Sequence, residues 1–277
     1  MLERVISGAV LAVLAVFFLL SGGTILACAC LFLSVIAYLE LTKATKVRRG
    51  AKINFLEIIG VIGVFLYYAL IYIGELTKTE YRVYLILFIC LLLISYMFVY
   101  VFAFPKFVSE QVMTAFTCFI YGPVMLSFIY LSRNLENGIY YVWLIFISSW
   151  ISDTCAYLVG VTIGKHKLAP VLSPKKSIEG AAGGILGSAL VGALYGYFVI
   201  APRVNNAHVI WILAVISAIG ALISQVGDLA ASGIKRNHEI KDYGKLIPGH
   251  GGVMDRFDSV IFTAPIVYGM LILWMKP

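Results

Sequence analysis

The feature that most constrains this chain is a series of nine long apolar runs separated by short polar connections. A transmembrane helix needs about 20 apolar residues to cross the hydrocarbon core of a bilayer. Only 13% of the 277 residues are charged, against about 25% in an average soluble domain. The sequence therefore predicts an all-α polytopic integral membrane protein with about nine transmembrane helices. The runs are Val5–Leu20, Thr24–Leu41, Phe55–Ile73, Val83–Phe104, Val112–Leu131, Ile139–Ile163, Ala181–Ile200, Val209–Ser232 and Ser259–Met275.

The distribution of basic residues predicts the orientation of these helices. If the N-terminus is cytoplasmic, sixteen of the 21 lysines and arginines fall on the cytoplasmic side, as the positive-inside rule requires. We therefore expect a multi-pass protein of the inner (cytoplasmic) membrane. The net charge of +7 then reflects loops that face anionic lipid headgroups, and it does not indicate nucleic acid. The basic loop Lys43–Lys52 fits a topology signal, with a lipid-headgroup contact as the alternative.

The polar residues that topology does not explain lie mainly in the C-terminal half. We divide the chain into residues 1–138, with about five N-terminal transmembrane helices, and residues 139–277, the predicted catalytic transmembrane region. Cytoplasmic loops are expected at residues 164–180 and 233–256.

Two aspartates lie within apolar runs, Asp153 in the sixth and Asp228 in the eighth. A carboxylate at membrane depth costs a few kcal/mol on insertion scales and usually marks a functional site. Asp228 shares a helical face with Ser217 and Ser224 and lies about 10 Å from Lys235 along the helix axis, near the cytoplasmic interface. A hydrogen bond between packed helices is the alternative for both aspartates.

The loop after the sixth run brings Lys175 and Lys176 to the start of the seventh. Ser177 is a suitable N-cap, and four glycines follow between residues 180 and 187. Basic side chains and exposed backbone N–H groups at a helix N-terminus favour a phosphate. The alternative is a basic loop followed by small residues that allow tight helix packing.

The segment Ser232–Asp258 is the most polar part of the chain. It contains Lys235 and Arg236, the turn His250-Gly251-Gly252, and then Asp255, Arg256 and Asp258. Glycines allow a backbone to approach a ligand closely, and carboxylate oxygens suit Mg²⁺. Phosphoryl and nucleotidyl transfer depend largely on positioning and charge neutralisation, which this set of residues can provide. A P-loop enzyme is excluded because the chain lacks G-x-x-x-x-G-K-[ST].

The segment also resembles the signature of the CDP-diacylglycerol synthases, also called phosphatidate cytidylyltransferases. That signature, S-x-x-K-R-x4-K-D-x5-P-x-H-G-G-x-x-D-R-x-D, is matched from Ser232 to Asp258. The stretches Gln225–Asp228 and Ser173–Gly180 are similar to the family as well. The resemblance covers essentially the whole chain but is sharp only from about Asp153 onward.

The resemblance implies that the protein makes CDP-diacylglycerol and pyrophosphate from CTP and phosphatidate, with Mg²⁺, at the cytoplasmic leaflet. By this resemblance Asp228 and Asp255 hold metal, while Asp153 and Asp258 support the metal or orient its ligands. The predicted catalytic residues are Asp228, Lys235, Arg236, Asp255 and Arg256. The predicted substrate-binding residues are Lys175, Lys176, Ser177, Ser232, His250, Gly251 and Gly252.

Two other functions remain open at this stage. A CTP-dependent kinase of polyprenol or another lipid alcohol shares part of the resemblance, and its product would distinguish it. An ion-coupled transporter would use Asp153 and Asp228 as coupling sites, but it would place such charges near the midplane. The small-residue faces could pack helices within one chain or in a homodimer.

Overall fold

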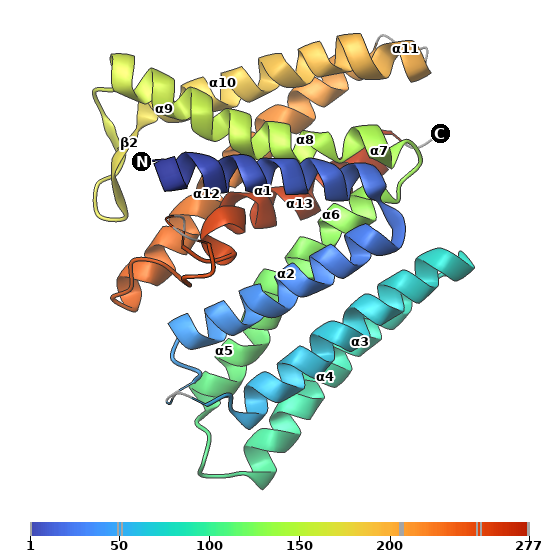
Figure 1. The fold of residues 1–277 in the computed structure, drawn as a ribbon, viewed down its shortest axis with the longest axis vertical. Helices are drawn as coiled ribbons and strands as arrows, with labels where there is room; N and C mark the ends of the chain where they lie inside the picture. Colours follow the sequence, from blue (N-terminus) through green and yellow to red (C-terminus); the bar gives the residue numbers. More distant parts are fainter. Residues whose placement is uncertain are drawn as a thin grey trace. The chain divides into compact units, whose positions relative to one another are not determined.

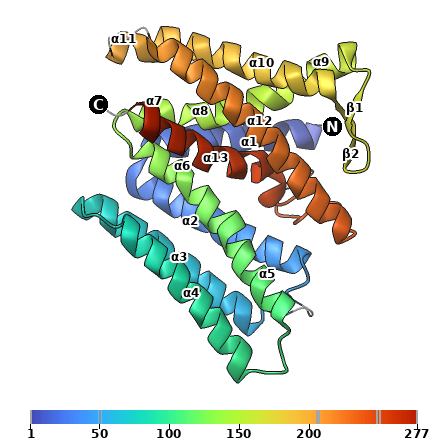
Figure 2. The same cartoon turned by 180° about the vertical axis from the view of Figure 1, so that it is seen from behind.

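The computed structural model describes residues 2–48, 50, 52–204, 208–247, 249 and 251–275, with only the backbone described for residues 2–7. The chain is mostly helical and carries one small hairpin (Figures 1 and 2). The helices are α1 (Leu2–Ser21), α2 (Gly23–Ala44), α3 (Phe55–Thr77), α4 (Arg82–Phe102), α5 (Ser109–Phe119), α6 (Met125–Arg133), α7 (Gly138–Tyr141), α8 (Trp143–Phe146), α9 (Ser152–Ile163), α10 (Ile178–Tyr195), α11 (Ala201–Val204), α12 (His208–Asn237) and α13 (Met254–Trp274). The π-helical segments are Ile120–Val124, Ile147–Ile151 and Gly196–Ile200, and the strands are β1 (Lys167–Ala169) and β2 (Ser173–Ser177).

The prediction of an all-α polytopic membrane protein is confirmed. Within the described residues, eight helical stretches are long and apolar enough to cross a bilayer. The remaining predicted segment, Val5–Leu20, corresponds to α1, whose described apolar part, Gly8–Ser21, is shorter than the other eight. The N-terminal orientation stays a prediction.

Two predicted loops prove to be more ordered than expected. The loop at 164–180 contains the β1–β2 hairpin, and α10 begins within it at Ile178. The loop at 233–256 is shorter, because α12 continues to Asn237 and α13 begins at Met254. Lys235 and Arg236 occupy the last turn of α12, where cations interact favourably with the helix dipole.

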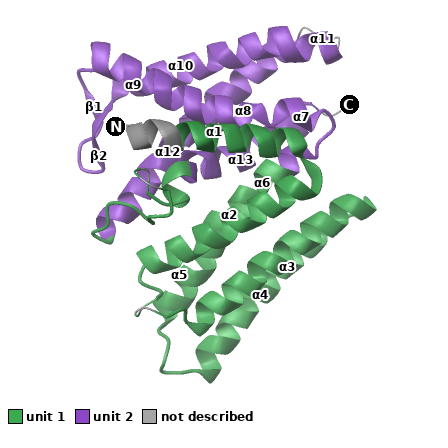
Figure 3. Ribbon diagram, in the orientation of Figure 1, with its two compact units in different colours: residues 1–130, 238–256 green, residues 131–237, 257–277 purple. Residues whose placement is uncertain are grey.

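The chain divides into two compact units (Figure 3). The first contains residues 1–130 and 238–256, and therefore includes α1 to α5 and the loop that precedes α13. Its core includes buried tyrosines joined by hydrogen bonds, with 2.8 Å between the hydroxyls of Tyr38 and Tyr96. The second contains residues 131–237 and 257–277. There α10 packs along both α9 and α12.

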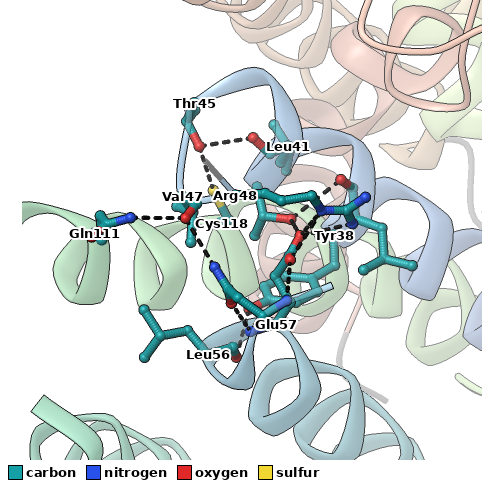
Figure 4. Close-up of polar contacts among 12 residues, drawn as sticks. Tyr38, Leu41, Thr45, Val47, Arg48, Leu56, Glu57, Gln111 and Cys118 are labelled. Atoms are coloured by element: carbon teal, nitrogen blue, oxygen red, sulfur yellow. Dashed lines mark hydrogen bonds and ion pairs between the residues drawn. The ribbon is translucent and has the colours of Figure 1, made fainter. Parts of the chain in front are cut away.

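A buried carboxylate organises the connection between α2 and α3 in the first unit (Figure 4). Glu57 is fully buried and accepts hydrogen bonds from Arg48 Nε at 2.9 and 3.0 Å and from Thr42 Oγ1 at 2.8 Å. It also forms a capping box with Asn54 at the start of α3. Breaking a buried ion pair by removing one partner typically costs about 3–5 kcal/mol. Arg48, in the loop interpreted as a topology signal, thus also neutralises a buried acid.

Candidate functional site

The second unit contains a cavity of about 500 Å³, within the usual size range of ligand sites. Its walls come from α9, the β1–β2 hairpin, α10 and α12. The lining includes Asp153 and Tyr157 from α9, Lys175 and Lys176 from β2, and Asp228 from α12. The structure thus brings together side chains that the sequence placed at one site from separate segments.

The hairpin that presents the two lysines is fixed at its base. Glu179, in the first turn of α10, accepts hydrogen bonds from the backbone N–H of Lys165 at 3.1 Å and from His166 Nδ1 at 2.6 Å. Ile178 N donates to His166 O at 2.9 Å. Ser177 Oγ accepts from Gly180 N at 3.1 Å, so the predicted N-cap is confirmed. These bonds hold Lys175 and Lys176 directly before the N-terminus of α10.

Lys176 and Asp228 form an ion pair. Each side chain has 28% of its surface exposed, so both remain accessible from the cavity that they line. A phosphate oxygen presented there would compete with the carboxylate for the ammonium group. The pair therefore holds a cation in place for an anionic ligand and keeps a carboxylate close to it.

Two further aspartates lie within electrostatic reach of Asp228. Asp153 interacts with Asp228 and Lys176, and Asp258 interacts with Asp228, Asp153 and Lys235. Over the described part of the chain, no group of three or more His, Cys, Asp or Glu side chains is close enough to hold a metal ion. Mg²⁺ is commonly bound through one or two carboxylates together with substrate phosphates, so the oxygen donors here fit that ion only in partnership with a substrate.

Gln225 is a site-supporting residue that the sequence analysis placed in a family-like stretch without giving it a role. Its Nε2 donates to Ser152 Oγ at 3.1 Å and to the carbonyl of Ala181 at 3.0 Å. It therefore ties α12 to both α9 and α10, one helical turn before Asp228. The available signal was a glutamine within an apolar run, three residues before Asp228, since residues three apart lie on the same helical face.

The glycines at the start of α10 serve helix packing. A Cβ atom at Gly183 would lie 2.5 Å from Val159, and one at Gly187 would lie 2.5 Å from Cys155. Both neighbours belong to α9, so these positions admit no side chain unless the helices separate. Their presence is explained by the packing alternative, and the phosphate interpretation now depends on the lysines and on the cap at Ser177.

Close approach also explains Gly227, directly before Asp228. A Cβ there would lie 2.9 Å from the carbonyl oxygen of Asp258. The missing side chain lets α12 and α13 approach each other beside the two aspartates.

The remaining predicted residues lie at the end of α12 and in the loop before α13. Ser232 and Lys235 are half-buried on α12, Arg236 and Arg256 are exposed, and Gly252 is buried. Gly251 has a φ of +87°, which favours glycine. His250 lies outside the described residues.

Asp255 is 7% exposed, and its Oδ2 accepts hydrogen bonds from Tyr243 N at 2.8 Å and Gly252 N at 3.0 Å. It thereby folds the loop that precedes α13. Asp255 belongs to the first compact unit and Asp228 to the second, so their sharing of one metal ion stays a prediction.

Comparison with known proteins identifies the family. The model of the cytidylyltransferase family matches residues 2–274. The phosphatidate cytidylyltransferase of Staphylococcus haemolyticus is 34% identical over 254 residues, which cover 92% of each chain. Those of Staphylococcus saprophyticus and Staphylococcus aureus are 42% identical over 149 residues. In these two comparisons the chain spans about half, 55%, of the relative's length. The match across nearly all of its residues means that the chain belongs to the cytidylyltransferase family.

Proposed function

We propose that this protein is a phosphatidate cytidylyltransferase, which makes CDP-diacylglycerol and pyrophosphate from CTP and phosphatidate at the cytoplasmic leaflet. The observation that carries the proposal is the cavity of the second unit, where Lys175, Lys176 and Asp228 meet. The name of the Staphylococcus haemolyticus relative, a phosphatidate cytidylyltransferase, supports cytidylyl transfer to phosphatidate.

The reaction joins two anions, so neutralisation of charge is the main task. A phosphate monoester carries a charge of about −1.5 to −2 near neutral pH and needs no strong general base to become a nucleophile. One of its oxygens attacks the α-phosphorus of CTP, and the bond to the β-phosphate oxygen breaks, so that pyrophosphate leaves. Lys175 and Lys176 are placed to neutralise phosphate oxygens in the cavity. We assign Lys235, Arg236 and Arg256 to the same task.

The lipid substrate requires access from the bilayer. Tyr157 and Val161 line the cavity and are 70% and 69% exposed on α9. Apolar side chains at the mouth of a charged cavity suit acyl chains that stay in the membrane while the headgroup reaches the lysines. CTP would then arrive from the aqueous side.

We also propose Mg²⁺ as the cofactor, because the available donors are carboxylate oxygens. Asp228 would hold it, supported by Asp153 or Asp258, with Asp255 as the further ligand predicted from the sequence. When bound, the ion would neutralise charge on the triphosphate. With Asp228 holding the ion, the ammonium group of Lys176 would be available to phosphate.

The decisive experiment incubates purified protein in phosphatidate-containing nanodiscs with Mg²⁺ and each of four nucleoside triphosphates. We expect pyrophosphate and a cytidine-containing lipid with CTP alone, and loss of both products when EDTA removes the metal. CDP release with a phosphorylated alcohol, after polyprenol replaces phosphatidate, would instead establish a lipid kinase. Absence of pyrophosphate with all four nucleotides would refute nucleotidyl transfer.

A further inference from the structure

Glu40, like Glu57 a buried acid of the first unit, contacts the segment 252–254 at the start of α13 directly. Glu40 lies one turn before the end of α2 and is 9% exposed. Its Oε1 accepts a hydrogen bond from Val253 N at 3.1 Å, and its Oε2 accepts one from Met254 N at 2.9 Å. Met254 begins α13, so the carboxylate satisfies amides that a helix N-terminus leaves unpaired. The favourable position of a negative charge there strengthens the contact.

The loop is shaped to enclose this carboxylate. A Cβ atom at Gly252 would lie 2.5 Å from Glu40 Cδ, and one at Gly244 would lie 2.7 Å from the same atom. Both glycines therefore leave room for Glu40. Gly252 belongs to the glycine pair of the signature, so this contact gives that glycine a physical reason besides approach to a ligand.

Glu40 and Asp255 together accept hydrogen bonds from three consecutive backbone amides. The N–H of Gly252 donates to Asp255, and those of Val253 and Met254 donate to Glu40. Their neighbouring negative charges interact with each other, and the amides offset that repulsion. A segment held at three successive amides loses its freedom before any substrate binds, which lowers the entropy cost of ordering it during the reaction.

We propose that Glu40 is a positioning residue of the nucleotidyl-transfer site. Its carboxylate holds the segment 252–256, and through it the carboxylate of Asp255 and the guanidinium of Arg256, in the arrangement that the reaction uses. The contribution of Glu40 to turnover rests on the function proposed above. Its restraint of the backbone can be measured without turnover, so the proposed function and the restraint by Glu40 can fail separately.

Glu57 supplies a matched control. It is likewise a buried carboxylate of the first unit, but its partners are Arg48, Thr42 and Asn54. Glu57→Gln should lower thermal stability without changing the hydrogen bonds of the segment 252–256. Glu40→Gln keeps the size of the side chain but replaces one of the two acceptor oxygens by an NH₂ group. That group is a donor, so it cannot pair with the backbone N–H that it would face.

The test measures hydrogen–deuterium exchange and turnover for wild type, Glu40→Gln and Glu57→Gln in the same detergent. For Glu40→Gln we expect faster exchange at Val253 and Met254, and kcat/KM per folded enzyme lower by about 10². For Glu57→Gln we expect wild-type exchange in that segment and wild-type kcat/KM per folded enzyme. Gly252→Ala introduces a Cβ against Glu40 and should cause the same increase in exchange and the same loss of activity. This variant takes the place of Glu40→Gln in the test if Glu40→Gln does not fold.

The proposal is overturned if residues 253–254 of Glu40→Gln exchange at the wild-type rate. It is also overturned if both Gln variants lose activity only in proportion to their unfolded fraction. If wild type itself releases no pyrophosphate, the proposed function fails. The exchange data would still decide whether Glu40 holds the segment.

Discussion

Replacing Lys176 by Met separates the catalytic interpretation of the cavity from a structural one. The substitution keeps an unbranched side chain of similar length and removes the cation that pairs with Asp228. If the pair exists to stabilise the fold, the variant should lose stability. If Lys176 exists to neutralise phosphate, it should lose activity while it stays folded.

The partial exposure of the pair sets the expected magnitudes. Both side chains are 28% exposed, and accessible ion pairs of this kind are typically worth only about 0.2–1 kcal/mol in stability. Removal of one group that stabilises transition-state charge typically costs about 10²–10³ in kcat, or roughly 2.7–4 kcal/mol. The loss of activity should therefore exceed the loss of stability by a wide margin.

The assay measures pyrophosphate release from CTP and phosphatidate, together with thermal unfolding in the same detergent. Lys176→Arg keeps the charge and should recover part of the activity. Lys165→Met is the matched control, because Lys165 is exposed, precedes the same hairpin and does not line the cavity. If Lys176→Met turns over within about threefold of wild type, well below the loss expected for a transition-state group, the catalytic reasoning is wrong.

Three further predictions follow from the same unit. Asp228→Asn should abolish incorporation of labelled CTP into lipid and leave the detergent-solubilised protein folded; near-normal turnover would contradict its metal role. Gln225→Leu loses both hydrogen bonds that tie α12 to its neighbours and removes the donor to the buried hydroxyl of Ser152, so we expect about 1–3 kcal/mol of destabilisation in urea unfolding; an unchanged midpoint would argue against it. Gly183→Ala places a Cβ against Val159 and should cost about 1–3 kcal/mol by overpacking, whereas equal or greater stability in thermal unfolding would contradict the packing interpretation.

The membrane helices could be predicted closely because their signal is local. For example, the run Phe55–Ile73 became α3 (Phe55–Thr77), and Ile139–Ile163 became a stretch that also ends at Ile163. In a bilayer the backbone hydrogen bonds must be satisfied within the segment, so apolar length alone indicates a helix. The ends were less predictable, because α12 continues through its charged residues to Asn237.

The hairpin and the glycines depend on contacts that the sequence does not display. Strands β1 and β2 are three and five residues long and are fixed through Glu179 from the next helix. Likewise, the packing role of Gly183 depends on which side chain of α9 faces it. A glycine at a helix start suits both a phosphate and a close helix, and only the position of the neighbour distinguishes them.

Glu40 and Glu57 show where the sequence held a signal that went unused. Both lie within predicted membrane segments, as Asp153 and Asp228 do, and a carboxylate at that depth is expected to have a specific role. Their partners distinguish those roles. Glu57 is neutralised by an arginine that does not line the cavity of the second unit, whereas the carboxylate of Glu40 is stabilised by hydrogen bonds from backbone amides.

Asp228 differs from these two acids because its partner, Lys176, itself lines that cavity. Under the proposed function an anionic substrate would replace Asp228 at the lysine, whereas Arg48, the partner of Glu57, is not among the residues that line this cavity. We therefore expect the partner of a carboxylate, more than its depth in the membrane, to distinguish an acid that meets the substrate in this cavity from one that holds the backbone.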